Sequence, residues 1–329
     1  MNIENTLEII LITYNRKNYL ENTLKQILAD KSPIKNCKIT VLDNASTDGS
    51  GELIREYAKK HPNIKYIRHN RNIGGNANIA RAFEEAALKY LWVLADDDDY
   101  NFHHWEEVET AIEKDYDLIV VNTEIIQGGE VSLSQLPRLL TFLPASIHKT
   151  DNLDSVTMTN IYDNIPNWFP HLAAVFKTIN NNGKVYISQH NIITSGVNNN
   201  NKGISVNHIM NDLAPAQKNL FFEVAFLKSL EMIKDKKLRS AVVENFAPGY
   251  SFFKAILNTF KKNRIELNNY AGNLLAPWTV FNLSQKIRYL IALLCLDILF
   301  ILKYPRYYRK RKLWKAELEK AIKNNPSNN

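Results

Sequence analysis

Four consecutive aspartates, Asp96 to Asp99, end the apolar run of the segment LWVLADDDDY at residues 91–100. Carboxylates about 4 Å apart repel each other by about 4 kcal/mol at an effective dielectric constant of about 20. Such a cluster needs a compensating cation, and Mg²⁺ and Mn²⁺ are hard cations that prefer oxygen ligands. An acidic first turn of the following helix would explain one or two aspartates but not all of them. The segment therefore predicts a divalent cation site.

Three further polar segments each follow a short apolar run. They are TYNRK from Thr13, DNASTDGS from Asp43 and RNIGGNAN from Arg71. Each segment alone is explained by an Asx turn, a helix cap or a flexible turn. If the apolar runs are parallel strands, however, their carboxyl ends share one edge of a sheet, and Thr13, Asp43, Arg71 and Asp96 converge there. This convergence predicts a ligand site.

Apolar patterning predicts the elements that hold these residues. Continuous β-branched runs indicate buried strands, and apolar residues at helical spacing indicate amphipathic helices. We expect strands at 7–13, 37–43, 64–69, 91–95 and 117–122, and helices at 18–30, 51–61, 75–90 and 102–114. Strands that alternate with helices predict an α/β fold with a mostly parallel sheet flanked by helices.

The first turn of this fold argues against other nucleotide-binding classes. A dinucleotide site needs glycine after the first strand so that pyrophosphate can approach the helix, and the segment TYNRKNYL has none. A GxxxxGK[ST] loop is also missing from the sequence, which excludes a P-loop. A sugar-nucleotide nucleotidyltransferase can share the sheet and stays an alternative, although its glycine-rich loop is missing too.

The composition places the chain among globular proteins of a reducing compartment. It has 329 residues, of which 45% are hydrophobic, and a net charge of +7. Cys37 and Cys295 lie far apart without the spacing of a metal site, which disfavours a disulfide framework. No basic segment precedes the short N-terminal apolar run, so the run is read as a strand and not as a signal peptide. We expect a cytoplasmic protein.

The segments LITYNRKNYL, VLDNASTDGS, RNIGGNANIARA and WVLADDDDY together resemble the nucleotide-sugar-binding half of family 2 glycosyltransferases, which have the GT-A fold. The resemblance covers residues 7–125 in the right order and spacing. It implies an inverting, metal-dependent transfer of a sugar from a nucleotide diphosphate donor, usually UDP-linked. The acceptor would be a hydroxyl of a glycan or lipid-linked glycan in surface polysaccharide synthesis. A non-catalytic membrane-bound scaffold with this fold is the other alternative.

The resemblance also implies roles for individual residues. An Asp-x-Asp motif at the end of the fourth strand, here Asp96 to Asp98, would hold the ribose and a Mn²⁺ or Mg²⁺ ion. Asp96 and Asp98 would be the metal ligands. The nucleotide-binding residues would be Thr13, Tyr14, Asn15, Arg16, Asp43, Arg71, Asn76, Asp96 and Asp97.

The catalytic base is expected in the second half of the chain. In many family members a helix there begins with Glu-Asp, whose aspartate deprotonates the acceptor. The helix predicted to open at Pro170 has His171 in that place, and histidine can act as a base near neutral pH. Asp163 is the second candidate, and a purely structural role is the alternative for His171. Three further histidines could add a metal ligand, namely His148, His190 and His208.

Three regions are expected along the chain. The nucleotide-sugar-binding half is expected at 1–125 and the acceptor-binding half at 126–215. The acceptor-binding half has a possible strand at 140–143 and a lid or disordered loop at 197–203. A C-terminal helical region follows at 216–329.

The apolar stretch 289–302 in this last region is too short to span a bilayer. The basic segment 303–315 is typical of an interfacial anchor on an anionic membrane, here the inner face of the plasma membrane, or else of a solvated end of a core helix. With neither a QxxRW motif nor several transmembrane segments, the chain is expected to add single sugars, and no nucleic-acid partner is expected.

Overall fold

The computed structural model describes residues 2–123, 134, 136, 140–194, 225–246, 280–287 and 290. The chain divides into two compact units, residues 1–280 and residues 281–329. The polar segment 197–203, His208, Cys295, most of the expected C-terminal helices and the basic segment 303–315 lie outside the described residues.

The first unit is built on one eight-stranded sheet in the order β3-β2-β1-β4-β7-β6-β8-β5. The strands are β1 Leu7–Thr13, β2 Lys38–Asp43, β3 Ile64–Arg68, β4 Tyr90–Ala95, β5 Asp99–Tyr100, β6 Leu118–Thr123, β7 Ser146–Lys149 and β8 Val185–Thr194. The first four expected strands form a parallel block, β3-β2-β1-β4, as the alternation with helices predicted. Beyond β4 the sheet is mixed, because β7 runs antiparallel between β4 and β6. The α/β fold is confirmed.

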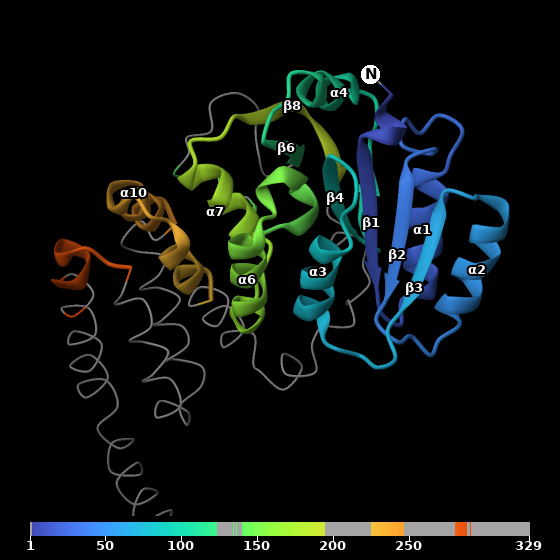
Figure 1. Ribbon diagram of the computed structural model, residues 1–329, viewed down its shortest axis with the longest axis horizontal. Helices are drawn as coiled ribbons and strands as arrows, with labels where there is room; N and C mark the ends of the chain where they lie inside the picture. Colours follow the sequence, from blue (N-terminus) through green and yellow to red (C-terminus); the bar gives the residue numbers. More distant parts are fainter. Residues whose placement is uncertain are drawn as a thin grey trace, which may run out of the picture. The chain divides into compact units, whose positions relative to one another are not determined.

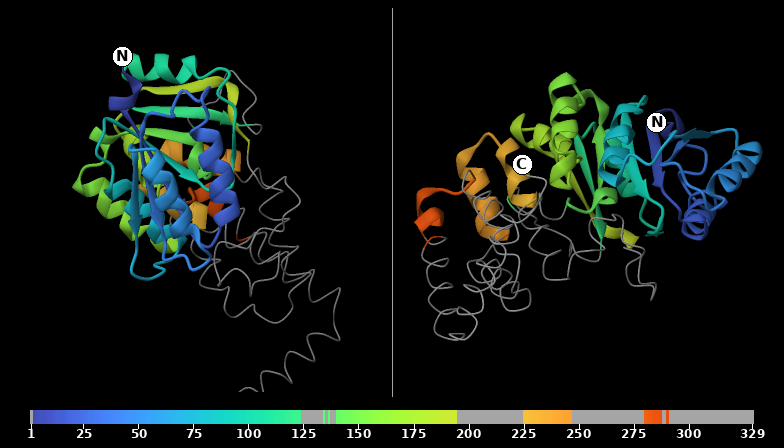
Figure 2. Two further views of the ribbon diagram at one scale, coloured as in Figure 1. Left: turned by 90° about the vertical axis from the view of Figure 1, so that its right-hand side faces the viewer. Right: turned by 90° about the horizontal axis from the view of Figure 1, so that it is seen from below.

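Helices cover both faces of the sheet. The six that do so are α1 Lys17–Ile27, α2 Ser50–Lys60, α3 Gly75–Glu84, α4 Glu106–Glu113, α6 Ser155–Asp163 and α7 Leu172–Asn180; a further helix, α10, spans Lys236–Phe246. Residues of α1, α2 and α4 share one buried apolar cluster with the sheet, whereas residues of α3, α6 and α7 share another. Figures 1 and 2 show these two sets of helices on opposite sides of the strands.

Alternate side chains of the continuous apolar strands supply both clusters. In β1, Ile9 and Leu11 belong to the cluster of α1, and Ile10 belongs to the cluster of α3. All three side chains are fully buried. A strand covered on both faces is apolar at most of its positions, and this is why β1 reads as a nearly continuous run and not as an alternating one. Its buried Glu8 is the exception, and its carboxylate accepts hydrogen bonds from Thr40 and from the backbone amide of Ala87.

Three predicted elements differ in the structure. The expected strand at 140–143 is wrong: the chain turns there and enters the short 3₁₀ helix η2, Leu143–Ala145, before β7 begins. Pro144 has no N–H for a strand ladder, and its carbonyl instead accepts a hydrogen bond of 2.8 Å from Nε1 of Trp92. Helix α3 ends at Glu84, six residues before the predicted end at residue 90. In the segment that follows, the backbone amide of Ala87 donates a hydrogen bond of 2.8 Å to the buried Glu8 carboxylate. Helix α4 begins only at Glu106.

A short helical segment opens the second unit at residues 283–287. Asn282 and Gln285 form a reciprocal cap, in which the amide of each residue donates to the side-chain oxygen of the other at 2.9 Å. Among the residues that the structure describes, no helix combines the length and the apolar character needed to cross a bilayer.

Candidate active site

The carboxyl ends of β1, β2 and β4 lie at one level of the sheet. Thr13 at the end of β1 pairs with Asp43 at the end of β2, and Ile12 pairs with Ala95 of β4. The amide of Asn44 donates to the carbonyl of Thr13 at 3.0 Å, which ties the first two strand ends together. The parallel register therefore brings the first, second and fourth polar segments to one edge of the sheet, as predicted.

Within the described structure, Arg16 supplies the cation that the aspartate run needs. Its Nη1 lies 3.0 Å from Oδ1 of Asp96 and 2.6 Å from Oδ2 of Asp97. The hydroxyl of Thr13 donates to the other oxygen of Asp96 at 2.6 Å. Burial raises the pKa of Asp96 to about 6, although Arg16 and Thr13 oppose this rise. Asp96 is therefore mostly ionised at neutral pH and is held in one orientation from both sides.

Helix α1 anchors the backbone of the aspartate loop. The hydroxyl of Thr23 donates to the carbonyl of Asp96 at 3.0 Å. Nε2 of Gln26 donates to Oδ1 of Asp99 at 3.1 Å, and Oε1 of Gln26 accepts from the backbone amide of Tyr100 at 2.9 Å. Sequence reasoning missed both supporting residues. Their spacing of three places them on one helix face, but that pattern does not indicate which loop the face will meet.

Asp43 is fully buried, and hydrogen-bond donors surround its carboxylate. Its Oδ1 accepts a hydrogen bond of 2.8 Å from the backbone amide of Ser46, and its Oδ2 accepts one of 2.7 Å from the hydroxyl of Tyr66. Burial and the nearby Asp43 carboxylate raise the pKa of Tyr66, so its phenol stays a proton donor. Nε of Arg68 lies 3.5 Å from Oδ2 of Asp43. Asp43 is therefore an acceptor with donors on both of its oxygens.

The turns after β1 and β2 hold each other in place. Asn15 has a positive φ of 51° and Ala45 one of 67°. Asparagine tolerates this left-handed region, whereas alanine adopts it at a cost of about 1 kcal/mol or more. The amide of Asn15 donates to Oγ of Ser46 at 2.9 Å, and Oδ1 of Asn15 accepts from the amide of Thr47 at 2.7 Å. The side chain of Tyr14, in the first of these turns, is half-buried. The hydrogen bonds between the two turns therefore fix the backbone that carries Tyr14 and Arg16.

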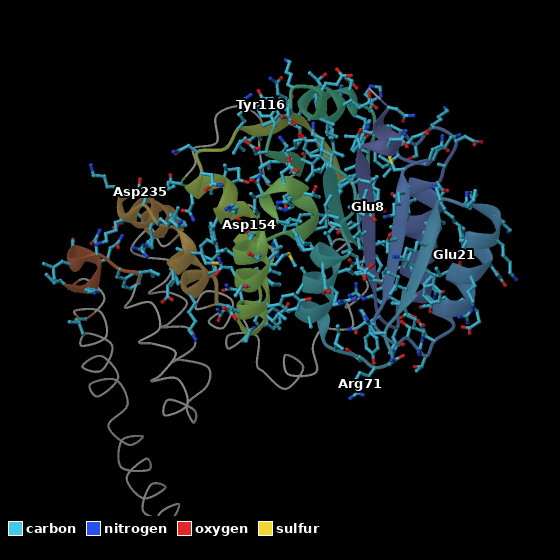
Figure 3. All side chains as sticks on the ribbon, viewed as in Figure 1. Glu8, Glu21, Arg71, Tyr116, Asp154 and Asp235 are labelled. Atoms are coloured by element: carbon cyan, nitrogen blue, oxygen red, sulfur yellow. The ribbon has the colours of Figure 1, made fainter. Side chains whose placement is uncertain are left out.

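Arg71 and Asn76, the two predicted nucleotide-binding residues in the segment after β3, lie in different places. The side chain of Arg71 is exposed and lies at the outer edge of the molecule in Figure 3. Arg68, three residues earlier, is the arginine that reaches the Asp43 carboxylate. Asn76 points toward the second half of the chain, and its amide donates at 2.8 Å to the carbonyl of Ile165 in the 3₁₀ helix η4, Ile165–Asn167. Asp163, at the end of α6, is exposed and lies two residues from this contact.

His171 lies immediately before α7 with its ring inside the core. The side chain is 1% exposed, and Nε2 is 2.8 Å from the carbonyl of Leu140. A carbonyl can only accept a hydrogen bond, so Nε2 carries the proton and Nδ1 has the lone pair. Nδ1 has no hydrogen-bond partner among the described residues. Burial lowers the pKa of His171 to about 4, so the ring is neutral at pH 7.

His148 on β7 is also buried, with an exposed fraction of 2%, and its ring packs edge-on against Phe83. Its Nε2 lies 2.9 Å from Oγ of Ser146. Burial, together with His171 nearby, lowers the pKa of His148 to about 3. This position is inside the core and not beside the aspartate run.

The two buried histidines predict acid-sensitive stability. Unfolded histidines take up protons near pH 6.5, whereas His148 and His171 in the folded chain stay neutral to about pH 4. The unfolded state thus binds more protons in this window, and each ring should remove about 1.4 kcal/mol of the free energy of unfolding per pH unit between about pH 6 and 4. Urea unfolding at pH 7, 6 and 5 measures this slope. His148→Gln should abolish about half of the slope, and equal slopes in the parent and the variant would contradict the assignment.

The family was established by comparison with known proteins. The sequence model described as "Glycosyl transferase family 2" matches residues 8–206, which is more than half of the chain. The chain is a family 2 glycosyltransferase. Among curated relatives, it is 36% identical over 87 residues to the abequosyltransferase RfbV of Salmonella typhimurium, a match that covers 26% of each chain. It is 27% identical over 92 residues to the putative teichuronic acid biosynthesis glycosyltransferase TuaG of Bacillus subtilis, over 28% of this chain and 36% of TuaG.

Solved structures match over a larger part of this glycosyltransferase. TarS of S. aureus in complex with UDP-GlcNAc has a TM-score of 0.57 at 15% identity, over 82% of this chain and 81% of the TarS chain. The mannosyltransferase PcManGT of Pyrobaculum calidifontis, in complex with GDP-Man and Mn²⁺, has a TM-score of 0.53 at 14% identity, over 98% of this chain and 88% of its own. These likenesses establish the GT-A fold, as predicted. By contrast, the matches to RfbV and TuaG span only about a quarter to a third of those relatives.

Proposed function

We propose that this family 2 glycosyltransferase is a metal-dependent, inverting enzyme that transfers a sugar from a UDP-linked donor to a hydroxyl of a glycan acceptor. The observation that carries the proposal is the position of the Asp43 carboxylate and the Asp96–Asp98 run at one edge of the sheet. Asp43 would offer an acceptor for a base, and the run would offer carboxylates for a ribose and a cation. The complexes of TarS with UDP-GlcNAc and of PcManGT with GDP-Man support a nucleotide-sugar donor.

In this proposal the nucleoside lies over the ends of β1 and β2. Asp43 accepts a hydrogen bond from the imide of uracil, with Thr13, Tyr14 and Asn15 around the base and ribose. Because Asp43 is fully buried under Tyr66 and Arg68, one of these two must move before a base can reach it. Arg68 is the better candidate to move, since its side chain is 42% exposed and its Nε lies 3.5 Å from Asp43, although its hydrogen bond of 3.1 Å to the carbonyl of Ser46 must break as well. Arg71 would lie near the base or the phosphates, as the resemblance implies, and Asn76 is a weaker candidate.

The donor set fits a hard divalent cation such as Mn²⁺ or Mg²⁺. Asp98 and Asp96 are the proposed ligands, and carboxylate oxygens together with donor phosphates are what such ions prefer. The cation would neutralise the charge that develops on the nucleotide diphosphate as the glycosidic bond breaks. Arg16 holds Asp96 and Asp97 toward the nucleotide side while Thr13 fixes the second oxygen of Asp96. Asp98 is therefore the ligand on which the proposal chiefly depends.

The acceptor hydroxyl needs a base on the side of α6 and α7. We propose His171, whose ring is locked in one tautomer by Leu140 and keeps its lone pair on Nδ1. Asp163 is the second candidate, because it ends the helix that leads to η4 beside Asn76. Attack by the activated hydroxyl on the face opposite the departing diphosphate would invert the anomeric carbon.

Nucleotide binding tests the donor assignment directly. Asp43→Asn should weaken UDP binding roughly tenfold, because an amide N–H₂ donor replaces one of the two acceptor oxygens while the hydrogen bond from Ser46 can persist. Isothermal titration with UDP, GDP and CDP, each with Mn²⁺, measures the effect and the base preference. The matched control is Glu52→Gln, an exposed carboxylate on α2. An unchanged UDP affinity would remove Asp43 from the site, and failure of every nucleotide to bind would favour the non-catalytic scaffold.

The remaining assignments concern the acceptor and the surroundings of the enzyme. We propose that 1–125 forms the donor half, 126–215 the acceptor half and 216–329 a helical region. RfbV and TuaG, as named, support an acceptor in surface polysaccharide synthesis. Peripheral contact with an anionic membrane through the basic segment 303–315 is part of the proposal, although this segment lies outside the described residues.

A further inference from the structure

A second cluster of ligand-type side chains lies away from the aspartate run. His104 is in the turn before α4, Glu107 is in the first turn of α4, and His190 is in the middle of β8. Each residue offers one ligand atom, and these atoms all lie within 4.8 Å of one another. Among the residues that the structure describes, no other group of three or more histidine, cysteine or acidic side chains brings its ligand atoms this close together.

The surrounding contacts hold the three side chains together. Helix α4 and strand β8 lie side by side at the top of Figure 1. Oε1 of Glu107 contacts Nδ1 of His190, and its Oε2 accepts a hydrogen bond of 2.6 Å from the amide of Gln189. The rings of His104 and His190 stack with their centroids 3.7 Å apart and their planes at 18°.

The donor atoms of the cluster suit a metal ion. Two imidazole rings and one carboxylate come together from α4, the turn before it and β8, and they offer nitrogen and oxygen ligand atoms within 4.8 Å of one another. This is a mixed nitrogen and oxygen donor set.

We propose that His104, Glu107 and His190 bind one divalent transition-metal ion, for which Zn²⁺ is the best match. Two imidazoles and one carboxylate form a donor set that zinc uses with water in the fourth position, whereas Mg²⁺ prefers oxygen ligands alone. Bonds of about 2.0–2.2 Å require the ligand atoms to approach to roughly 3.5 Å. Small rotations of three partly exposed side chains suffice for this approach.

The ion would fasten the connection after the aspartate run to β8. Asp99 and Tyr100 of β5 pair with Thr194 and Ile193, and the amide of Asn101 donates to the carbonyl of Ile192 at 2.8 Å. None of the four aspartates belongs to the cluster, so the two groups of ligand-type side chains are separate. Binding would close a loop that begins at this ladder and ends at α4, and it would stabilise the backbone that positions Asp98 and Asp99.

Zinc titration of the untagged full chain in the absence of nucleotide tests the proposal. Isothermal titration should give one site, with a dissociation constant below about 10 µM and a rise in melting temperature of about 4 °C at a hundredfold excess over that constant. His190→Ala and Glu107→Gln should each weaken binding at least tenfold. His103→Ala removes an exposed neighbouring histidine outside the cluster and should leave binding unchanged. Asp98→Asn should also leave it unchanged, which separates this ion from the one proposed for transfer.

Cobalt provides a second readout that does not depend on heat or stability. Co²⁺ bound by two imidazoles and a carboxylate should produce visible absorption bands in the parent and in His103→Ala, and these bands should be lost in His190→Ala. The proposal is overturned if the parent binds neither metal below about 0.1 mM, or if His190→Ala binds both as tightly as the parent. Binding that disappears in Asp98→Asn but persists in His190→Ala would assign the ion to the aspartate run instead.

Discussion

Asp98→Asn is expected to lower kcat for sugar transfer roughly 10³-fold while the fold persists. The substitution keeps the shape of a side chain that is 3% exposed and removes only its charge. The proposed cation would then lose its principal protein ligand, and the charge that develops on the diphosphate would be less well compensated; the loss of one such stabilising interaction costs about 10²–10³-fold. Initial rates at saturating UDP-sugar and a series of Mn²⁺ concentrations measure the effect.

The control for this variant is an exposed aspartate away from the site. Asp30→Asn alters a carboxylate that is fully solvated and lies 3.6 Å from Lys35, so turnover should not change. Thermal unfolding of Asp98→Asn should occur at or above the temperature of the parent, because one of four neighbouring negative charges is gone. Turnover within threefold of the parent at every Mn²⁺ concentration would show that Asp98 is not the ligand.

The convergence of the strand ends in this candidate site could be predicted from the sequence because it depends on local order and register. Thr13, Asp43 and Asp96 each end a strand of the parallel block, and parallel strands of similar length deliver their ends to one edge. The contact of Arg16 with Asp96 and Asp97 could not be predicted in this way, because these residues are 80 and 81 positions apart in the sequence. The contact depends on the turn after β1, in which Asn15 has a left-handed backbone conformation. The sequence predicted that a cation was needed at the aspartates but not that the protein itself supplies one.

The second half of the site was harder to predict because its residues depend on packing between elements. The antiparallel insertion of β7 between β4 and β6 brings His148 beneath α3, where it contacts Phe83. Arg68 and Arg71 differ by three residues at the end of β3, and only the strand register decides that Arg68 reaches Asp43. Likewise, neither His104 nor Glu107 stands out alone, since the cluster forms only when α4 packs on β8 beside His190.

His171→Gln separates a catalytic histidine from a structural one. The amide of glutamine can donate to the carbonyl of Leu140 as Nε2 of His171 does, so a structural role should be rescued by this substitution. Glutamine has no basic nitrogen to replace Nδ1, so a catalytic role predicts that kcat falls roughly 10²-fold. The KM for the donor should stay near that of the parent, because His171 contacts Leu140 and none of the residues proposed to bind the nucleotide.

The comparison is completed by Asp163→Asn, which removes the second candidate from an exposed position that tolerates substitution. If His171 is the base, Asp163→Asn keeps nearly full turnover, and kcat of the parent stays flat from pH 8 down to about pH 5, because the ring is already neutral with a pKa of about 4. Donor and acceptor must both be saturating, so that the loss of kcat reports proton transfer and not binding. Full activity in His171→Gln together with a large loss in Asp163→Asn would transfer the role to Asp163 and leave His171 as a buried residue that fixes the segment before α7.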